Sequence, residues 1–103
     1  MTRGHKYHEA PTPLRLMFYM YVLFSLKDHA LYFGWTVDLR ARFKEHQAGK
    51  VQSTRPRRPW KLVYYEAYAS REDAMERERQ LKHYAKAWGQ LKRRIQRSIR
   101  QAA

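Results

Sequence analysis

Two aromatic-rich segments separated by a short polar turn constrain the fold more than any other feature of this sequence. Residues 18–24 and 30–34 are rich in aromatic and β-branched side chains, and each is short enough to be a strand. The polar residues 27–29 lie between them, so we predict an antiparallel hairpin. Alternation along the first strand places Phe18, Met20, Val22 and Phe24 on one face, and Tyr19, Tyr21 and Leu23 on the other.

A helix is predicted directly after this hairpin. Thr36 is a suitable N-cap, Asp38 places a negative charge in the first turn, and Gly49 is a suitable C′ residue. These start and stop signals predict a helix of about three turns.

Two polar residues of that helix are expected to border its apolar stripe. Leu39 and Phe43 are four positions apart and form the stripe. Arg42 and His46 are also four apart and, at roughly 100° per residue, lie beside the stripe rather than opposite it. Both side chains should therefore lie at the edge of the core.

The second half of the chain predicts a third strand and two more helices. Residues 61–69 alternate as a strand does, and Ser70 with Asp73 resembles a capping box that opens a helix through about His83. Residues 88–99 have a helical period. The apolar side of this last helix is formed by Trp88, Leu91, Ile95 and Ile99, with Trp88 as a packing anchor.

A carboxylate interrupts the apolar side of the helix that begins after Ser70. Ala74, Met75, Glu78 and Leu81 fall within one arc of roughly 120°. A carboxylate in such a stripe has an unfavourable desolvation cost unless a cation accompanies it. Glu78 is therefore a candidate for a metal ligand, and an ion pair with Lys82 is the alternative.

Charge and composition indicate one basic domain that binds a polyanion. The 103 residues carry 22 lysines and arginines against nine acidic residues, a net charge of +13, and nucleic acid is the first candidate partner. A surface that is merely solvated is the alternative.

Residues 1–13 are predicted to be a flexible arm and residues 14–103 a single domain. The basic connection between Gly49 and Trp60 suits phosphate contacts, or is an ordinary solvated loop; its candidates are Lys50, Arg55, Arg57 and Arg58.

The chain contains no cysteine, which excludes disulfides and thiolate metal sites and is compatible with a cytoplasmic location. We expect no membrane partner, because the apolar run from Leu16 to Leu26 is too short to span a bilayer and lacks a cleavage signal.

The motifs together resemble those of the GIY-YIG nuclease family. Tyr19-Met20-Tyr21 is followed, after ten residues, by Tyr32-Phe33-Gly34, and Arg42 and His46 come eight and twelve positions after that glycine. The resemblance covers roughly Phe18 to Arg94, although Tyr19 and Met20 replace the first glycine and the isoleucine of the family pattern. Further similar segments are Asp38-Leu39, Glu45-His46, Gly49-Lys50, Arg57-Arg58-Pro59, residues 61–66 and residues 77–82.

The resemblance implies an α+β domain with a three-stranded antiparallel sheet packed by about three helices. It also implies a metal-dependent endonuclease that hydrolyses phosphodiester bonds in DNA, in repair or processing, with a protein partner for targeting. A tyrosine would take the proton of the attacking water, with Tyr21 slightly favoured over Tyr32. Glu78 would hold Mg²⁺ or Mn²⁺. The implied catalytic residues are Tyr21, Tyr32, Arg42, His46 and Glu78.

Other interpretations stay open at this point. A non-catalytic DNA- or RNA-binding module, or a small ribosome-associated protein, would share the charge. In such a protein Tyr21 and Tyr32 would be packing residues, and Arg42 with His46 a surface pair of the helix. Binding alone, however, requires neither both tyrosines nor an inward glutamate.

Overall fold

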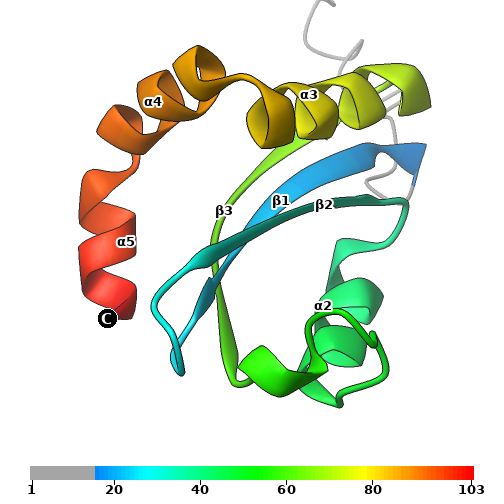
Figure 1. The fold of residues 1–103 in the computed structure, drawn as a ribbon. Coiled ribbons are helices and arrows are strands. Elements are labelled where there is room, and N and C mark those ends of the chain that lie inside the picture. Colours follow the sequence, from blue (N-terminus) through cyan, green and yellow to red (C-terminus); the bar gives the residue numbers. More distant parts are fainter. Residues whose placement is uncertain (1–15) are drawn as a thin grey trace, which may run out of the picture.

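The computed structural model describes residues 16–103, and within that range the chain is an α+β fold with three strands and four α-helices (Figure 1). The predicted fold class is confirmed, although the helices number four rather than about three. The predicted arm of residues 1–13 lies outside the described residues. The elements are β1 (Phe18–Ser25), β2 (Leu31–Thr36), α2 (Leu39–Gln47), the 3₁₀ helix η2 (Arg55–Arg57), β3 (Trp60–Tyr68), α3 (Arg71–His83), α4 (Ala85–Arg94) and α5 (Gln96–Ala102).

The first strand is the centre of the sheet. Its neighbours are β2 on one side and β3 on the other, and both pairs are antiparallel, so the predicted hairpin is confirmed. β1 is buried almost throughout because both faces of the sheet are covered. Tyr21 therefore stands between Gly34 of β2 and Tyr65 of β3.

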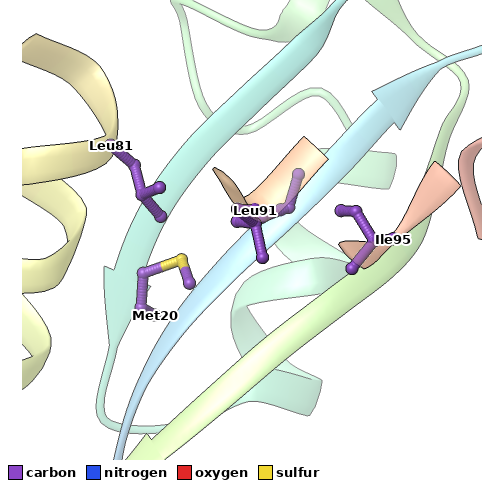
Figure 2. Packing of buried hydrophobic residues seen from close by; sticks show 5 residues of the cluster. Met20, Leu81, Leu91 and Ile95 are labelled. Atoms are coloured by element: carbon purple, nitrogen blue, oxygen red, sulfur yellow. The ribbon is translucent and has the colours of Figure 1, made fainter. Parts of the chain in front are cut away.

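The two faces of β1 belong to two different apolar clusters, as the alternation predicted. Met20 and Val22 pack against helical residues of α3 and α4 and of the junction that follows α4 (Figure 2). Tyr21 and Leu23 pack with Trp60 on the other face, where α2 covers the sheet. The helical contacts of the first cluster are Leu81, Leu91 and Ile95, and those of the second are Leu39 and Phe43.

Helix α2 begins two residues later than predicted and ends as predicted. The N-cap is Asp38, whose side chain accepts from the amide of Ala41 at 3.1 Å, and not Thr36, which still belongs to β2. At the other end, Gly49 has a φ of +77°, and the amides of Gly49 and Lys50 donate to the carbonyls of His46 and Glu45. This Schellman motif requires the left-handed conformation that glycine adopts readily.

Helix α3 has the predicted start, but one predicted core residue is wrong. The Ser70 hydroxyl accepts from the amide of Asp73 at 3.4 Å, while Ala74 and Leu81 are buried. Met75 is 42% exposed, because it lies at the edge of the helix face that meets the sheet.

The predicted last helix, residues 88–99, is in fact two helices. The chain leaves helical geometry at Ile95, whose φ is −111° and ψ is 22°. The bend lets Leu91 and Ile95 both reach the curved sheet (Figures 1 and 2). Trp88 packs edge to face on Phe33 at 5.2 Å between ring centroids. Among residues 16–103, no helix has the length and apolar character needed to cross a membrane.

Candidate active site

A buried hydrogen bond joins the central strand to the end of α2. Tyr21 Oη lies 2.8 Å from Nε2 of His46, and their side chains are 1% and 0% exposed. The two rings also pack in a T-shaped arrangement, with their centroids 5.7 Å apart. The sequence predicted that His46 borders the core, beside the apolar stripe of its helix. In the structure its side chain is fully buried.

The histidine is held from its other side by a residue that the sequence analysis missed. Thr54, in the loop after α2, places Oγ1 at 2.8 Å from Nδ1 of His46 and at 3.4 Å from the carbonyl oxygen of Val51. A hydroxyl has one proton, and we assign it to the Val51 carbonyl, which makes Thr54 the acceptor from Nδ1–H of His46. Nε2 is then the unprotonated nitrogen and accepts the phenol proton of Tyr21.

The burial of this hydrogen-bonded chain changes the acidity of both ends. Burial, together with the charge of Arg42, lowers the pKa of His46 to about 4, so the imidazole is neutral at pH 7. Burial raises the pKa of Tyr21 to about 12, although a hydrogen bond from Arg42 acts to lower it. In the resting protein the proton therefore stays on Tyr21 and points at a free lone pair of His46.

Gly34 leaves the space that the Tyr21 ring occupies. A Cβ atom at Gly34 would lie 2.4 Å from both Cζ and Oη of Tyr21, which is closer than atoms can approach. Tyr21 on β1 and Gly34 on β2 are paired across the two strands, so the Tyr21 ring fits only if residue 34 has no side chain. The glycine of Tyr32-Phe33-Gly34 therefore serves the tyrosine of Tyr19-Met20-Tyr21.

Tyr32, Glu78 and Lys82 lie beside this pair. The Tyr32 ring meets His46 at 5.3 Å between centroids, and Lys82 Nζ lies 5.6 Å from the centre of the Tyr32 ring. The same Nζ is 2.8 Å from Oε2 of Glu78, whose charge also acts on the phenol of Tyr21. The ion pair expected as the alternative for Glu78 is therefore present, and it lies next to both tyrosines.

Arg42 completes the group. Its Nη1 lies 2.9 Å from Oε1 of Glu45, and its side chain is 37% exposed. Hydrogen bonds and charge from Glu45 and Tyr21 raise the pKa of Arg42 despite its partial burial. The structure thus brings together all five predicted catalytic residues, and adds Gly34, Thr54 and Lys82 to them.

The donor set fits a magnesium or manganese ion held by one protein carboxylate. No three histidine, cysteine, aspartate or glutamate side chains gather as a metal cluster in the part of the chain that is described. Mg²⁺ commonly keeps several waters and takes one or two carboxylates together with substrate phosphate oxygens. Glu78, with a side chain 19% exposed and adjacent to Tyr21, meets that requirement.

The four basic residues of the loop before β3 differ in what they contact. Arg55 and Arg58 donate to backbone carbonyls at 2.6 and 3.0 Å and leave other donors available, and Lys50 is exposed. Arg57 instead pairs with Asp28 at 2.8 Å and lies 4.8 Å above the Trp60 ring. Their role in phosphate binding stays a prediction, and Arg57 also ties the loop to the hairpin turn.

A second polar group, not predicted, fixes α3 on the sheet. Arg77 donates to both oxygens of Glu66 at 2.9 and 3.1 Å, and Tyr64 and Tyr68 donate to the same carboxylate. Burial raises the pKa of Glu66, but these hydrogen bonds outweigh it, and the pKa lies below its usual range. Because Glu78 follows Arg77, this bridge also sets where Glu78 points.

The chain is similar in sequence to known proteins. A family model described as the GIY-YIG catalytic domain matches residues 17–96. The UPF0213 protein SH2523 of Staphylococcus haemolyticus is 41% identical over 69 residues, which are 66% of this chain and 83% of that protein. A UPF0213 protein of Syntrophus aciditrophicus is 41% identical over 71 residues, 67% of this chain and 80% of that one. The solution NMR structure of the UPF0213 protein BH0048 from Bacillus halodurans is 39% identical, covers 73% of this chain and 81% of that chain, and has a TM-score of 0.46.

Proposed function

Because the chain belongs to the GIY-YIG catalytic-domain family, we propose that it is a metal-dependent endonuclease that hydrolyses phosphodiester bonds in DNA. The observation that carries the proposal is the buried hydrogen-bonded chain from Tyr21 through His46 to Thr54. It presents one phenol, in a defined protonation state, beside a guanidinium and a carboxylate. A protein that only binds nucleic acid has no need of such an arrangement.

In this proposal Tyr21 is the general base and His46 is its proton acceptor. Oη of Tyr21 takes a proton from the attacking water while its own proton passes to Nε2 of His46. Because the two transfers occur together, no free phenolate has to form, and the unfavourable part of the step is protonation of His46, whose pKa is about 4 before substrate binds. Thr54 holds the imidazole in the tautomer that can accept. Tyr21 is 1% exposed, so the water has to reach Oη when substrate binds.

Arg42 is proposed to bind the scissile phosphate. One of its donors is engaged by Glu45, and the forked guanidinium has further donors for phosphate oxygens. These donors stabilise the charge that develops on the phosphate during hydrolysis.

Glu78 is proposed to hold the divalent ion, magnesium or manganese. When bound, the ion would stabilise the charge of the leaving oxygen. Lys82, which pairs with Glu78 at 2.8 Å, neutralises the carboxylate in the protein without metal. Tyr32 lies against His46 and under Lys82, and we assign it the positioning of these two groups.

The basic residues Lys50, Arg55 and Arg58 are proposed to hold phosphates on either side of the cleaved bond. Action in DNA repair or processing, with a protein partner for targeting, is the biological setting that we propose.

One observation favours the alternative, a DNA- or RNA-binding module without activity. The single proposed metal ligand, Glu78, already has a cation partner in Lys82. If that pair is only structural, Glu78→Gln should destabilise the fold, and no metal dependence is expected.

The test is cleavage of single-stranded, duplex and branched DNA with magnesium, manganese or chelator. We expect wild-type protein to cleave at least one substrate only with metal. Glu78→Gln should remain folded, bind DNA as well or slightly better, and lose nearly all cleavage. Full cleavage by folded Glu78→Gln would exclude the metal site.

A second pair of variants separates the two tyrosines. Tyr21→Phe removes the proposed base and should reduce the rate far more than Tyr32→Phe, which keeps the ring contact with His46. The opposite order would assign the base to Tyr32.

A further inference from the structure

The two C-terminal helices carry cations without any carboxylate among them. Residues 85–103 contain six basic residues and no aspartate or glutamate. No ion pair found within residues 16–103 engages Lys92, Arg93 or Arg100, and all three side chains are exposed. These cations are therefore available to an anionic partner.

A hollow of about 290 Å³ lies at the junction of α4 and α5, where these cations converge. The hollow is formed because the chain bends at Ile95, whose buried side chain anchors the junction on the sheet. One helix contributes residues before the bend and the other contributes residues after it. The lining residues are Lys92, Arg93, Gln96, Ile99 and Arg100.

We infer that this hollow binds a backbone phosphate of the DNA substrate, at a place separate from the active site. Two guanidinium groups, from Arg93 and Arg100, can donate forked hydrogen bonds to phosphate oxygens, and the ammonium of Lys92 adds charge. A membrane surface fits less well, because Leu91 and Ile95 are buried in the core and leave no wide apolar face to insert (Figure 2).

The hollow and the active site share no residue: α4 and α5 line the hollow, whereas the active-site side chains come from β1, β2, α2 and α3. α4 and the junction at Ile95 pack on the face that carries Met20 and Val22, whereas Tyr21 lies on the face covered by α2 (Figure 1). The phosphate in the hollow is therefore not the phosphate that is cleaved. The inference rests on the proposed function in one respect, because that function supplies the nucleic acid.

The experiment compares two double variants with the same loss of charge. Arg93→Gln/Arg100→Gln removes one hollow cation from each helix region, while Lys86→Gln/Arg97→Gln removes exposed cations of the same helices that do not line the hollow. DNA affinity is measured against salt concentration in the presence of chelator, which prevents metal-dependent cleavage. Circular dichroism verifies that each variant is folded.

We expect the hollow variant to lower the slope of log affinity against log salt by about one unit, so that raising the salt concentration from 50 to 200 mM weakens its DNA affinity by about fourfold less than that of wild type. The control should change the slope much less. Equal effects of the two variants would show a general field rather than a site, and an unchanged hollow variant would also overturn the inference.

Two further outcomes separate this inference from the proposed function. Wild-type protein that binds DNA together with an unaffected hollow variant rejects the hollow alone. Wild-type protein that does not bind DNA rejects both. Vesicles containing phosphatidylglycerol are the last arm: binding to them, but not to DNA, that is lost in the hollow variant would assign the site to lipid.

Discussion

At the scale of single residues, the site depends on one histidine that is buried in its neutral form. His46 has a pKa of about 4 in the folded protein and an ordinary value near 6.5 when unfolded. Between these values the unfolded state binds a proton that the folded state does not, so stability is full above pH 6.5 and falls as the pH drops towards 4.

Comparison with His46→Gln measures this effect, because glutamine keeps an amide in place of the ring but does not titrate. The advantage of wild type in free energy of unfolding should shrink by about 3 kcal/mol between pH 7 and pH 4. Urea unfolding at several pH values measures it. A difference that does not change with pH would mean that His46 is not buried neutral.

Gly34 provides a second residue-scale prediction. Gly34→Ala forces a Cβ against Cζ and Oη of Tyr21, so the phenol must move away from His46. We expect a destabilisation of about 1–3 kcal/mol from overpacking and a loss of cleavage of about 100-fold. Gly89→Ala is the control, since its Cβ meets nothing within 4 Å and should leave cleavage unchanged. Normal activity of Gly34→Ala would show that Tyr21 tolerates displacement.

At the scale of secondary structure elements, the position of Glu78 depends on how firmly α3 is attached to the sheet. The bidentate bridge from Arg77 to Glu66 on β3 is largely buried on both sides, since the two side chains are only 26% and 18% exposed. Glu66→Gln should destabilise the fold by about 1–3 kcal/mol and raise the metal concentration needed for cleavage.

The matched control on the same helix is Glu76→Gln. It removes the Arg79–Glu76 pair, whose side chains are 48% and 50% exposed, and should change stability much less than Glu66→Gln does. Thermal unfolding and a manganese titration of cleavage distinguish the two variants. Equal behaviour would contradict a role of β3 in orienting α3.

At the scale of the whole molecule, the net charge of +13 opposes compaction. Apart from Arg77–Glu66, the ion pairs found among residues 16–103 are partly exposed and each contributes little, so screening of the self-repulsion should outweigh their loss. Without DNA, the melting temperature should therefore rise between 50 and 500 mM sodium chloride. A fall would mean that the ion pairs dominate.

The sequence by itself determined the strands, the helices up to His83 and most residues of the candidate site. Local signals are sufficient for these: alternation separates Met20 from Tyr21, and helical spacing aligns Arg42 with His46. Local signals fail where several of them compete within a few residues. Thr36 and Asp38 are both good caps, and the extension of β2 through Thr36 decided in favour of Asp38. The apolar residues of 88–99 keep a helical period on both sides of Ile95, so the periodicity does not predict the bend there.

Only the tertiary structure decided which distant groups meet. Thr54 reaches His46 from eight positions away, through a loop whose path no local pattern describes. Gly34 matters because of where the Tyr21 ring passes, which depends on strand register. The charge of Glu78 acts on Tyr21 because α3 packs across all three strands of the sheet, and Lys82, which pairs with Glu78, lies over the Tyr32 ring for the same reason. The physical reason is common to all three: propensity and periodicity act over a few residues, whereas burial and hydrogen bonding between elements are settled by packing of the whole chain.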